Sequence, residues 1–208
     1  TCSLDDNTVE TSTTNANGCA VRTRDVSACR DSRIAQGLSG FWLNFSCRVT
    51  LTVQGGNVIV QADGQPDHPS NYFETTNPCY EALTASDKVQ NPNILGEQSF
   101  SMTIPMSPSG SSSAMSLGVV GIAANGVAIF SNAAAPGDNI YDEVRTFDKC
   151  EGHPAGTTYH YHIEPPTFTN NDSSFVGVMR DGNPIYGRTQ EGGGAPSLDA
   201  NGGETGTT

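Results

Sequence analysis

Three of the four histidines in this chain lie close together in its last third, where their spacing is suited to metal chemistry. His153, His160 and His162 fall within ten residues of one another. Alternate side chains of an extended strand share one face, so His160 and His162 are expected to point the same way, with Cα atoms about 6 to 7 Å apart. Tyr159 and Tyr161 then face the other side and can pack in a core. The two imidazoles are therefore close enough to converge on one ion.

Two further imidazoles are candidates to join this pair. A turn over residues 152–154 and a bend at Gly156 can bring His153 back towards it, and His68, in a loop before Pro69, is a candidate fourth ligand. Three or four imidazoles suit a transition metal ion, zinc or copper, whereas calcium and magnesium take mostly oxygen ligands. A second interpretation stays open, in which the same histidines form a surface pair or a hydrogen-bonded network without an ion.

Signals for catalytic residues are weaker. Asp142 and Glu143 are adjacent carboxylates, but neighbouring residues on a strand face opposite ways, which favours two solvated side chains over an acid–base pair. The serine-rich sequence contains no Gly-x-Ser-x-Gly elbow. We therefore predict no catalytic residue.

Cysteine usage indicates an oxidising compartment. The six cysteines form an even set without a Cys-x-x-Cys pair, which favours disulfides over a zinc ribbon or a redox site. Two N-glycosylation sequons begin at Asn44 and Asn171 and fit the same compartment. The chain also begins at Thr1 without a methionine, which indicates a removed signal peptide and hence a secreted protein. The predicted disulfide-forming residues are Cys2, Cys19, Cys29, Cys47, Cys79 and Cys150.

Charge and hydropathy exclude several partner classes. The formal net charge is −12, with Lys and Arg scattered singly, so no basic stripe is available for nucleic acid or an anionic lipid surface. No apolar run approaches the roughly 20 residues of a membrane-spanning helix. Glycans and other copies of the chain remain as the expected partners.

Short alternating apolar runs separated by turn signals predict an all-β fold, an antiparallel β-sandwich or open barrel with long loops. The chain divides into a loop-rich, disulfide-stapled amino-terminal lobe at residues 1–44 and a β domain at residues 45–208. One short helix is expected between Tyr80 and Val89. Strands are expected at residues 45–53, 57–62, 99–104, 117–123, 126–130, 174–179 and 184–186, with hairpin turns at 55–56, 125–126 and 181–182.

Several motifs together resemble the YHYH domain family, which is named for a tetrapeptide present here as Tyr159-His-Tyr-His162. The others are Gly152-His-Pro, Asp63-Gly-Gln-Pro-Asp-His68, Asn91-Pro-Asn93, Gly121 to Phe130 and Gly177 to Gly187, so the resemblance covers Phe45 to Thr208. It implies an extracellular β-rich module with a suspected metal site, but neither a substrate nor a reaction.

One departure concerns the end of the chain. Residues 151–158 align with residues 201–208 through a shared Gly-Thr-Thr, after which the first copy continues into its histidines and the chain stops in the second. Members of the family carry a second histidine segment there, and Gly203 stands where His153 would. The sequence is therefore either truncated at its carboxyl end or lacks that segment.

Two functions follow as expectations. The first is a secreted metal-binding glycoprotein with a structural or binding role, which self-assembles into an extracellular layer or filament through strand edges. The alternative is a copper- or zinc-dependent extracellular enzyme with an open position on a histidine-ligated ion. The lack of a recognisable nucleophile or general base favours the first.

Overall fold

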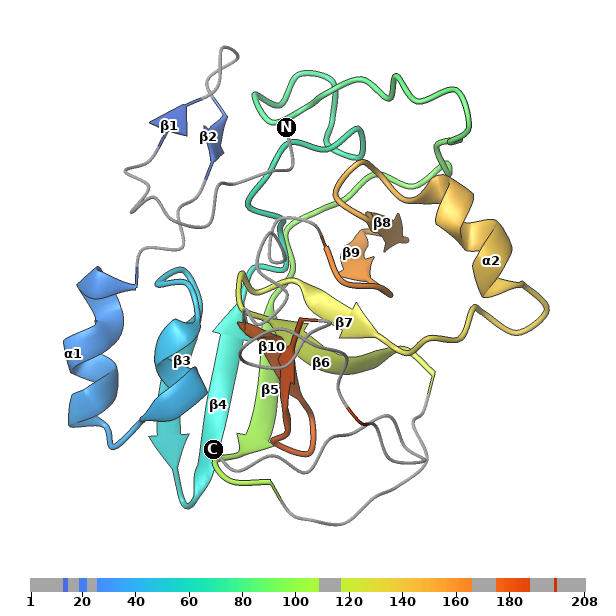
Figure 1. Cartoon of the computed structure of the whole chain (residues 1–208). Coiled ribbons are helices and arrows are strands. Elements are labelled where there is room, and N and C mark those ends of the chain that lie inside the picture. Colours follow the sequence, from blue (N-terminus) through green and yellow to red (C-terminus); the bar gives the residue numbers. More distant parts are fainter. Residues whose placement is uncertain are drawn as a thin grey trace.

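A computed structural model of the chain describes residues 13–14, 19–21, 26–108, 117–165, 175–187 and 197. These residues form a two-stranded, a three-stranded and a six-stranded sheet, with few helices (Figure 1). The small sheet pairs β1 (Thr13–Thr14) with β2 (Ala20–Val21). Cys2 and Asn171 lie outside the described residues.

The three-stranded sheet is an antiparallel meander of β3 (Thr50–Gln54), β4 (Asn57–Ala62) and β5 (Phe100–Pro105). The predicted hairpin between β3 and β4 is confirmed, and both residues of its Gly55-Gly56 turn take positive φ. Strand β3 begins at Thr50 and not at Phe45 as expected, because Ser46 to Val49 form a turn with a bond from Val49 N to Ser46 O.

The six-stranded sheet has the order β11-β10-β6-β7-β9-β8. Its strands are β6 (Val119–Ala123), β7 (Ala128–Phe130), β8 (Gly152–Ala155), β9 (Thr158–Tyr161), β10 (Phe175–Met179) and β11 (Pro184–Tyr186). All neighbours are antiparallel except β7 and β9, which are parallel, so the sheet is mixed where an antiparallel one was expected. A parallel pair needs a long crossover. Residues 131–151, which include α2 (Ile140–Glu143) and a 3₁₀ turn η2 (Val144–Thr146), supply the helical part of it.

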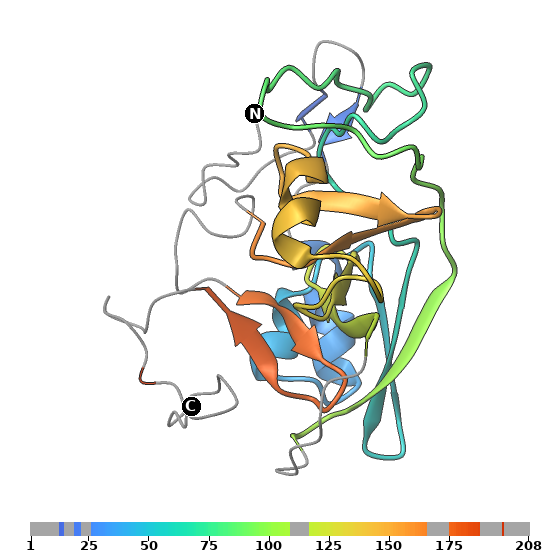
Figure 2. The ribbon, with the colours of Figure 1, turned by 90° about the vertical axis from the view of Figure 1, so that its right-hand side faces the viewer.

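One hydrophobic cluster joins the two larger sheets, so the all-β sandwich prediction is confirmed, and the described strands do not close into a barrel (Figure 2). Val58, Val60 and Ile104 contribute from the three-stranded sheet, and Ile122 and Val178 from the other. The cluster also takes in residues of the segment expected to form the amino-terminal lobe. These are Leu38, Trp42 and Leu43, of which the last two lie in the 3₁₀ helix η1 (Gly40–Asn44).

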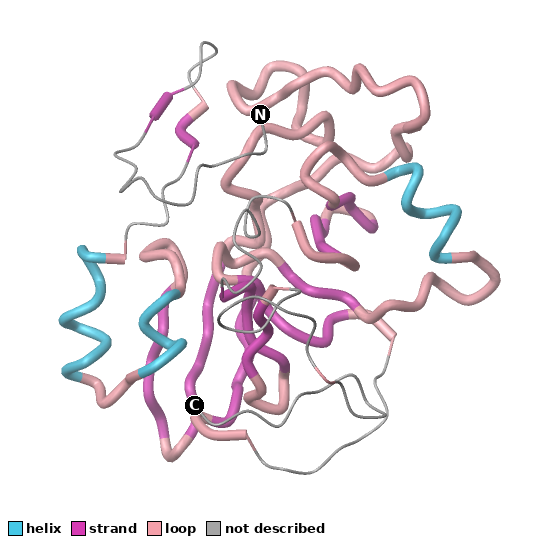
Figure 3. The backbone as a smooth tube through the Cα atoms, in the orientation of Figure 1, coloured by secondary structure: helices cyan, strands magenta, loops and turns pink. Residues whose placement is uncertain are grey.

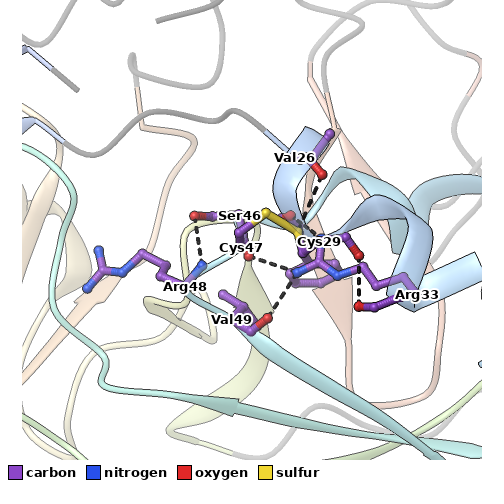
Figure 4. The surroundings of a disulfide bond; sticks show 9 residues. Val26, Cys29, Arg33, Ser46, Cys47, Arg48 and Val49 are labelled. Carbon is purple, nitrogen blue, oxygen red and sulfur yellow. Dashed lines mark hydrogen bonds between the residues drawn. A yellow bond between two sulfur atoms is a disulfide. The ribbon is translucent and has the colours of Figure 1, made fainter. Parts of the chain in front are cut away.

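A helix, α1 (Ser27–Ala35), lies where only loops were expected. The sequence does not reveal this helix, because the residue that it buries is Arg33 and no apolar stripe repeats at helical spacing. The Arg33 guanidinium donates to the carbonyls of Phe45, Ser46 and Val49, and the Cys29–Cys47 disulfide lies beside these bonds (Figure 4). The helix is thus anchored to the chain that leads into β3 by a buried cation and a covalent bond.

Disulfide bonds are confirmed. Cys19 pairs with Cys79 and Cys29 with Cys47, and Cys150 is also disulfide-bonded. None of the cysteines that the structure describes is free. The first pair joins the amino-terminal segment to the long loop between β4 and β5.

This long loop, residues 63–99, runs over the β8–β9 hairpin (Figure 3). The short helix expected between Tyr80 and Val89 is wrong. The start of that segment instead forms a parallel bridge between Ser70 and Tyr80, in which Glu81 N donates to Ser70 O, and the rest is turn and coil. Within the described ranges, no helix has both the length and the apolar character needed to cross a membrane.

The turn between β6 and β7 also differs in detail from the expected type I′. Gly126 takes a φ of +91°, but Asn125 does not adopt positive φ. Its side chain is engaged instead, because it accepts from Val127 N and donates to buried Asp67. The Asn-Gly pair therefore marks the hairpin but serves a side-chain network as well.

Candidate metal centre

The β8–β9 hairpin carries two of the three clustered histidines. His153 on β8 lies directly opposite His160 on β9, and the two-residue connection bends at Gly156, whose φ is +58°. Directly opposed residues of an antiparallel pair project from the same face. His153 therefore reaches His160 by strand pairing, and not by the turn at residues 152–154 that the sequence led us to expect.

His162 follows the end of β9 and completes the triad. Its Nε2 atom lies 3.0 Å from Nε2 of His160. The ring centroids of His153 and His160 are 4.6 Å apart, and those of His153 and His162 are 5.5 Å apart. One ligand nitrogen from each of the three lies within 4.8 Å of the others. The structure thus brings together three of the four histidines that were predicted as ligands.

The hydrogen bonds of His160 and His162 fix which ring nitrogen carries the proton. His160 Nδ1 lies 3.0 Å from the carbonyl oxygen of Thr158, and His162 Nδ1 lies 2.6 Å from that of Ser131. A carbonyl oxygen can only accept, so each Nδ1 must be the donor. Both Nε2 atoms of the neutral rings then present lone pairs, and these lone pairs face each other across 3.0 Å.

The same reasoning applies to His153, through a hydroxyl. Thr146 Oγ1 donates its proton to the carbonyl of Glu143, at 2.7 Å. It therefore accepts from His153 Nδ1, at 2.6 Å, and the Nε2 of His153 is also left with a lone pair. Partners at the distal nitrogen that fix tautomer and ring orientation in this way are typical of metal-bound histidines.

Burial keeps two of the imidazoles neutral. His153 is 6% exposed and His160 is 2% exposed. Burial, assisted by the neighbouring histidines, lowers the pKa of His153 to about 4 and the pKa of His160 to about 3. Phe130 stacks on His160 with centroids 3.8 Å apart, and Phe147 is parallel to the ring of His162. At pH 7 both buried rings are therefore in the neutral form that binds metal.

The carboxylate of Glu143, which we expected to be solvated, lies next to the triad. Asp142 and Glu143 lie on α2 and not on a strand, and Figures 1 and 2 place this helix beside the β8–β9 hairpin. Glu143 Oε2 is 3.5 Å from His162 Nε2 and 3.8 Å from His153 Nε2. Asn139 caps the helix by accepting from Tyr141 N. Asn139 followed three residues later by Asp142 is a helix-start signal that could have revealed this element.

His68 is not part of the cluster. It lies against the opposite face of β9, where its Nε2 is 3.1 Å from the hydroxyl of Tyr161 and its Nδ1 is 3.0 Å from the carbonyl of Pro69. Tyr159 and Tyr161 are buried on that face as predicted. The fourth-ligand expectation for His68 is therefore corrected: strand alternation separates it from the three imidazoles.

Buried polar contacts hold the hairpin from the same side. The Asp148 carboxylate is 1% exposed and accepts from the hydroxyls of Ser70 and Tyr159, at 2.5 and 2.8 Å. It also accepts from the backbone N–H groups of Cys150 and Gly152. Four donors to one buried carboxylate offset its desolvation and fix where β8 begins.

The Asn-Pro-Asn motif acts on the same strand. Asn91 Nδ2 and Asn93 Nδ2 both donate to the carbonyl of Pro154, at 3.0 and 3.1 Å. Pro154 follows His153 directly, so these two amides from the long loop set the position of the strand that carries His153. The sequence pattern identifies the motif but not this role.

The donor set is suited to a transition metal. Three imidazole nitrogens converge beside one carboxylate, the combination from which zinc and copper sites are built.

Comparison with known proteins gives one positive result. Residues 101–206, just over half of the chain, match the model of a family described as YHYH protein. The match includes all three clustered histidines and Glu143. No curated protein and no solved structure matches the chain.

Proposed function

The chain belongs to the YHYH family, and we propose that this member is an extracellular structural protein in which His153, His160 and His162 hold a zinc or copper ion. The family assignment supplies no activity, so the proposal rests on the site. The observation that carries it is the convergence of three imidazoles whose Nδ1 protons are all engaged elsewhere.

A cation explains this arrangement better than a hydrogen-bond network does. Two unprotonated nitrogens 3.0 Å apart repel each other unless a positive charge lies between them. A shared proton would require an imidazolium, and burial disfavours one at His160, whose pKa falls to about 3, so the proton would have to be carried by His162. A metal ion accepts both lone pairs and removes the repulsion.

The positions of the three histidines in the sheet support a structural role for the ion. His153 and His160 belong to the two strands of one hairpin, and His162 is bonded to Ser131, which follows β7. An ion held by all three would brace the edge of the six-stranded sheet. Structural zinc sites contribute directly to folding free energy in this way.

Secretion and glycosylation are part of the proposal. Disulfides form and persist in oxidising compartments, and two cross-link the first eighty residues. Asn44, the first sequon asparagine, is exposed at the end of η1 and so accessible to a glycan.

Self-association is the partner that we propose, through the outer edge of β5. The outer edge of β8 is poorly suited to pairing with another chain, because its backbone groups already have partners. Gly152 N donates to the Asp148 carboxylate, Gly152 O accepts from Asp148 N, and the carbonyl of Pro154 accepts from Asn91. Met106 N donates to Gly56 O, and hydrogen-bonded pairs alternate with non-bonded pairs along an antiparallel ladder. In the register of β4 and β5, the N–H groups of Ser101 and Thr103 therefore point away from β4 and are available to another strand. Light scattering at rising protein concentration tests this, and a strict monomer would contradict it.

A second candidate, a zinc or copper enzyme, has one observation in its favour. An open apolar pocket of about 260 Å³ has His162 in its lining, beside Ile129 and Val176. Catalysis would need a coordination position that a substrate or water can reach.

Elemental analysis of protein secreted from culture, without added metal, tests the proposed site. We expect close to one zinc or copper ion per chain. Removing the ion with a chelator should lower the midpoint of thermal unfolding, and returning one equivalent of metal should restore it. Protein free of metal that takes none up at neutral pH would contradict the proposal.

A further inference from the structure

We propose that the Glu143 carboxylate is the fourth protein ligand of the ion held by the three histidines, so that the site is closed and not open to a substrate. This inference rests on the proposed function. It adds a residue that the histidine pattern does not contain, and it decides between the structural and the catalytic candidate.

Three of the separations between donor atoms are close to those of a four-coordinate ion, and the three imidazole nitrogens lie within 4.8 Å of one another. Zinc bonds of about 2.0 to 2.1 Å place the ligand atoms of a tetrahedron about 3.3 Å apart. The observed separations are 3.0 Å between His160 Nε2 and His162 Nε2, and 3.5 Å between His162 Nε2 and Glu143 Oε2. The 3.8 Å from Glu143 Oε2 to His153 Nε2 is slightly longer. The carboxylate oxygen therefore stands at ligand distance from two of the three nitrogens.

The local structure aims Glu143 at the triad. Its carbonyl accepts from Thr146 Oγ1, the atom that also accepts from His153 Nδ1. The same hydroxyl thus ties the backbone of Glu143 to the ring of His153. The neighbouring Asp142 is exposed, while the side chain of Glu143 is 20% exposed. Glu143 lies within ion-pair distance of His153 and His162, both members of the triad.

Charge gives a second reason. A divalent ion bound by three neutral imidazoles leaves two positive charges in a mostly buried site, and burying uncompensated charge is costly. One carboxylate halves that charge. Bound to the ion, the carboxylate would also occupy a coordination position that water could otherwise take.

Cobalt(II) titration of the full-length protein tests the inference, because the visible absorption of cobalt reports its coordination. The variant is Glu143→Gln, and the matched control is Asp142→Asn on the same helix. A side chain that only holds a metal ligand in position is worth about 10- to 100-fold in metal affinity, so loss of a direct ligand should weaken cobalt binding at least ~10-fold. The control should bind like wild type.

Azide added to the cobalt-loaded wild type gives a reading that needs no variant. A closed site should show no spectral change, and this absence supports the inference even if Glu143→Gln fails to fold. Equal cobalt affinities for Glu143→Gln and Asp142→Asn, or an azide-induced spectrum in wild type, would overturn it while leaving the three-histidine site intact. Wild type that binds no cobalt and no zinc would instead mean that the proposed function itself is wrong.

Discussion

The Nε2 atoms of His160 and His162 lie 3.0 Å apart, and in the neutral rings neither of them has a proton to share. Each ring donates its Nδ1 proton to a backbone carbonyl, Thr158 for His160 and Ser131 for His162. The protein therefore holds two lone pairs face to face in a buried place. Such an arrangement is stable when a cation lies between them, and for this reason we regard the triad as a metal site.

Thr146 should act on metal binding without touching the ion. Replacing Thr146 with Val removes the acceptor that orients His153 and should weaken zinc affinity about 10- to 100-fold. Thr158→Val is the matched control, because His160 uses the Thr158 backbone carbonyl, which that substitution retains. Competition with a coloured chelator measures both. Equal affinities in the two variants would show that the Thr146 hydroxyl does not position the ring.

Tyr159 should matter for stability and not for metal content. Tyr159→Phe removes one of the donors to buried Asp148 and should lower the free energy of unfolding by about 1–3 kcal/mol. Tyr141→Phe is the control, since Tyr141 is 81% exposed. Urea unfolding measures both variants. If they prove equally stable, the Asp148 network does not hold the hairpin.

Stability of the metal-free protein should depend on pH through His153 and His160. The unfolded histidines titrate near 6.5, whereas the folded pKa values fall to about 4 and about 3. Below pH 6.5 the unfolded chain therefore takes up protons that the native protein does not. The free energy of unfolding should decrease as pH falls from about 6.5 towards 4, with a slope of up to about 1.4 kcal/mol per pH unit for each histidine.

Urea unfolding of chelator-treated protein between pH 4.5 and 7.5 measures this slope. Above pH 6.5 the two histidines should contribute no pH dependence to the free energy of unfolding. His160→Asn removes one of the two titrating groups, so its slope should be shallower. Parallel pH profiles for wild type and variant would contradict the assignment.

Arg33 should be more important for the fold than its place on a polar helix indicates. Arg33→Met removes the guanidinium that donates to three backbone carbonyls and should lower the free energy of unfolding by about 3 kcal/mol. Arg30→Met, at an exposed position on the same helix, should change it little. Chemical denaturation compares them, and similar losses would mean that the buried bonds are not what anchors α1.

Period-2 patterns and turn residues predicted most of the sheet. Strands β4 and β11 have the expected bounds, and the face shared by His160 and His162 follows from alternation alone. Alternation also predicted correctly that Tyr159 and Tyr161 would be buried on the other face. These features are local, so a single strand carries the whole signal.

Features that depend on long-range approach were not predictable in the same way. The place of His153 depends on hairpin register, and that of Glu143 on how a crossover of some twenty residues returns to the sheet. His68 had the right residue type but sits behind β9. Helix α1 escaped because it buries a guanidinium, which gives no apolar period.

The most direct test of the central claim is zinc titration calorimetry on wild type, His160→Ala and His68→Ala. Each variant removes one buried imidazole, and the two imidazoles lie on opposite faces of β9. We predict one ion per chain for wild type and for His68→Ala, provided the latter is folded by circular dichroism, and no stoichiometric binding for His160→Ala. Full zinc binding by His160→Ala, or none by wild type at neutral pH, would contradict the metal site.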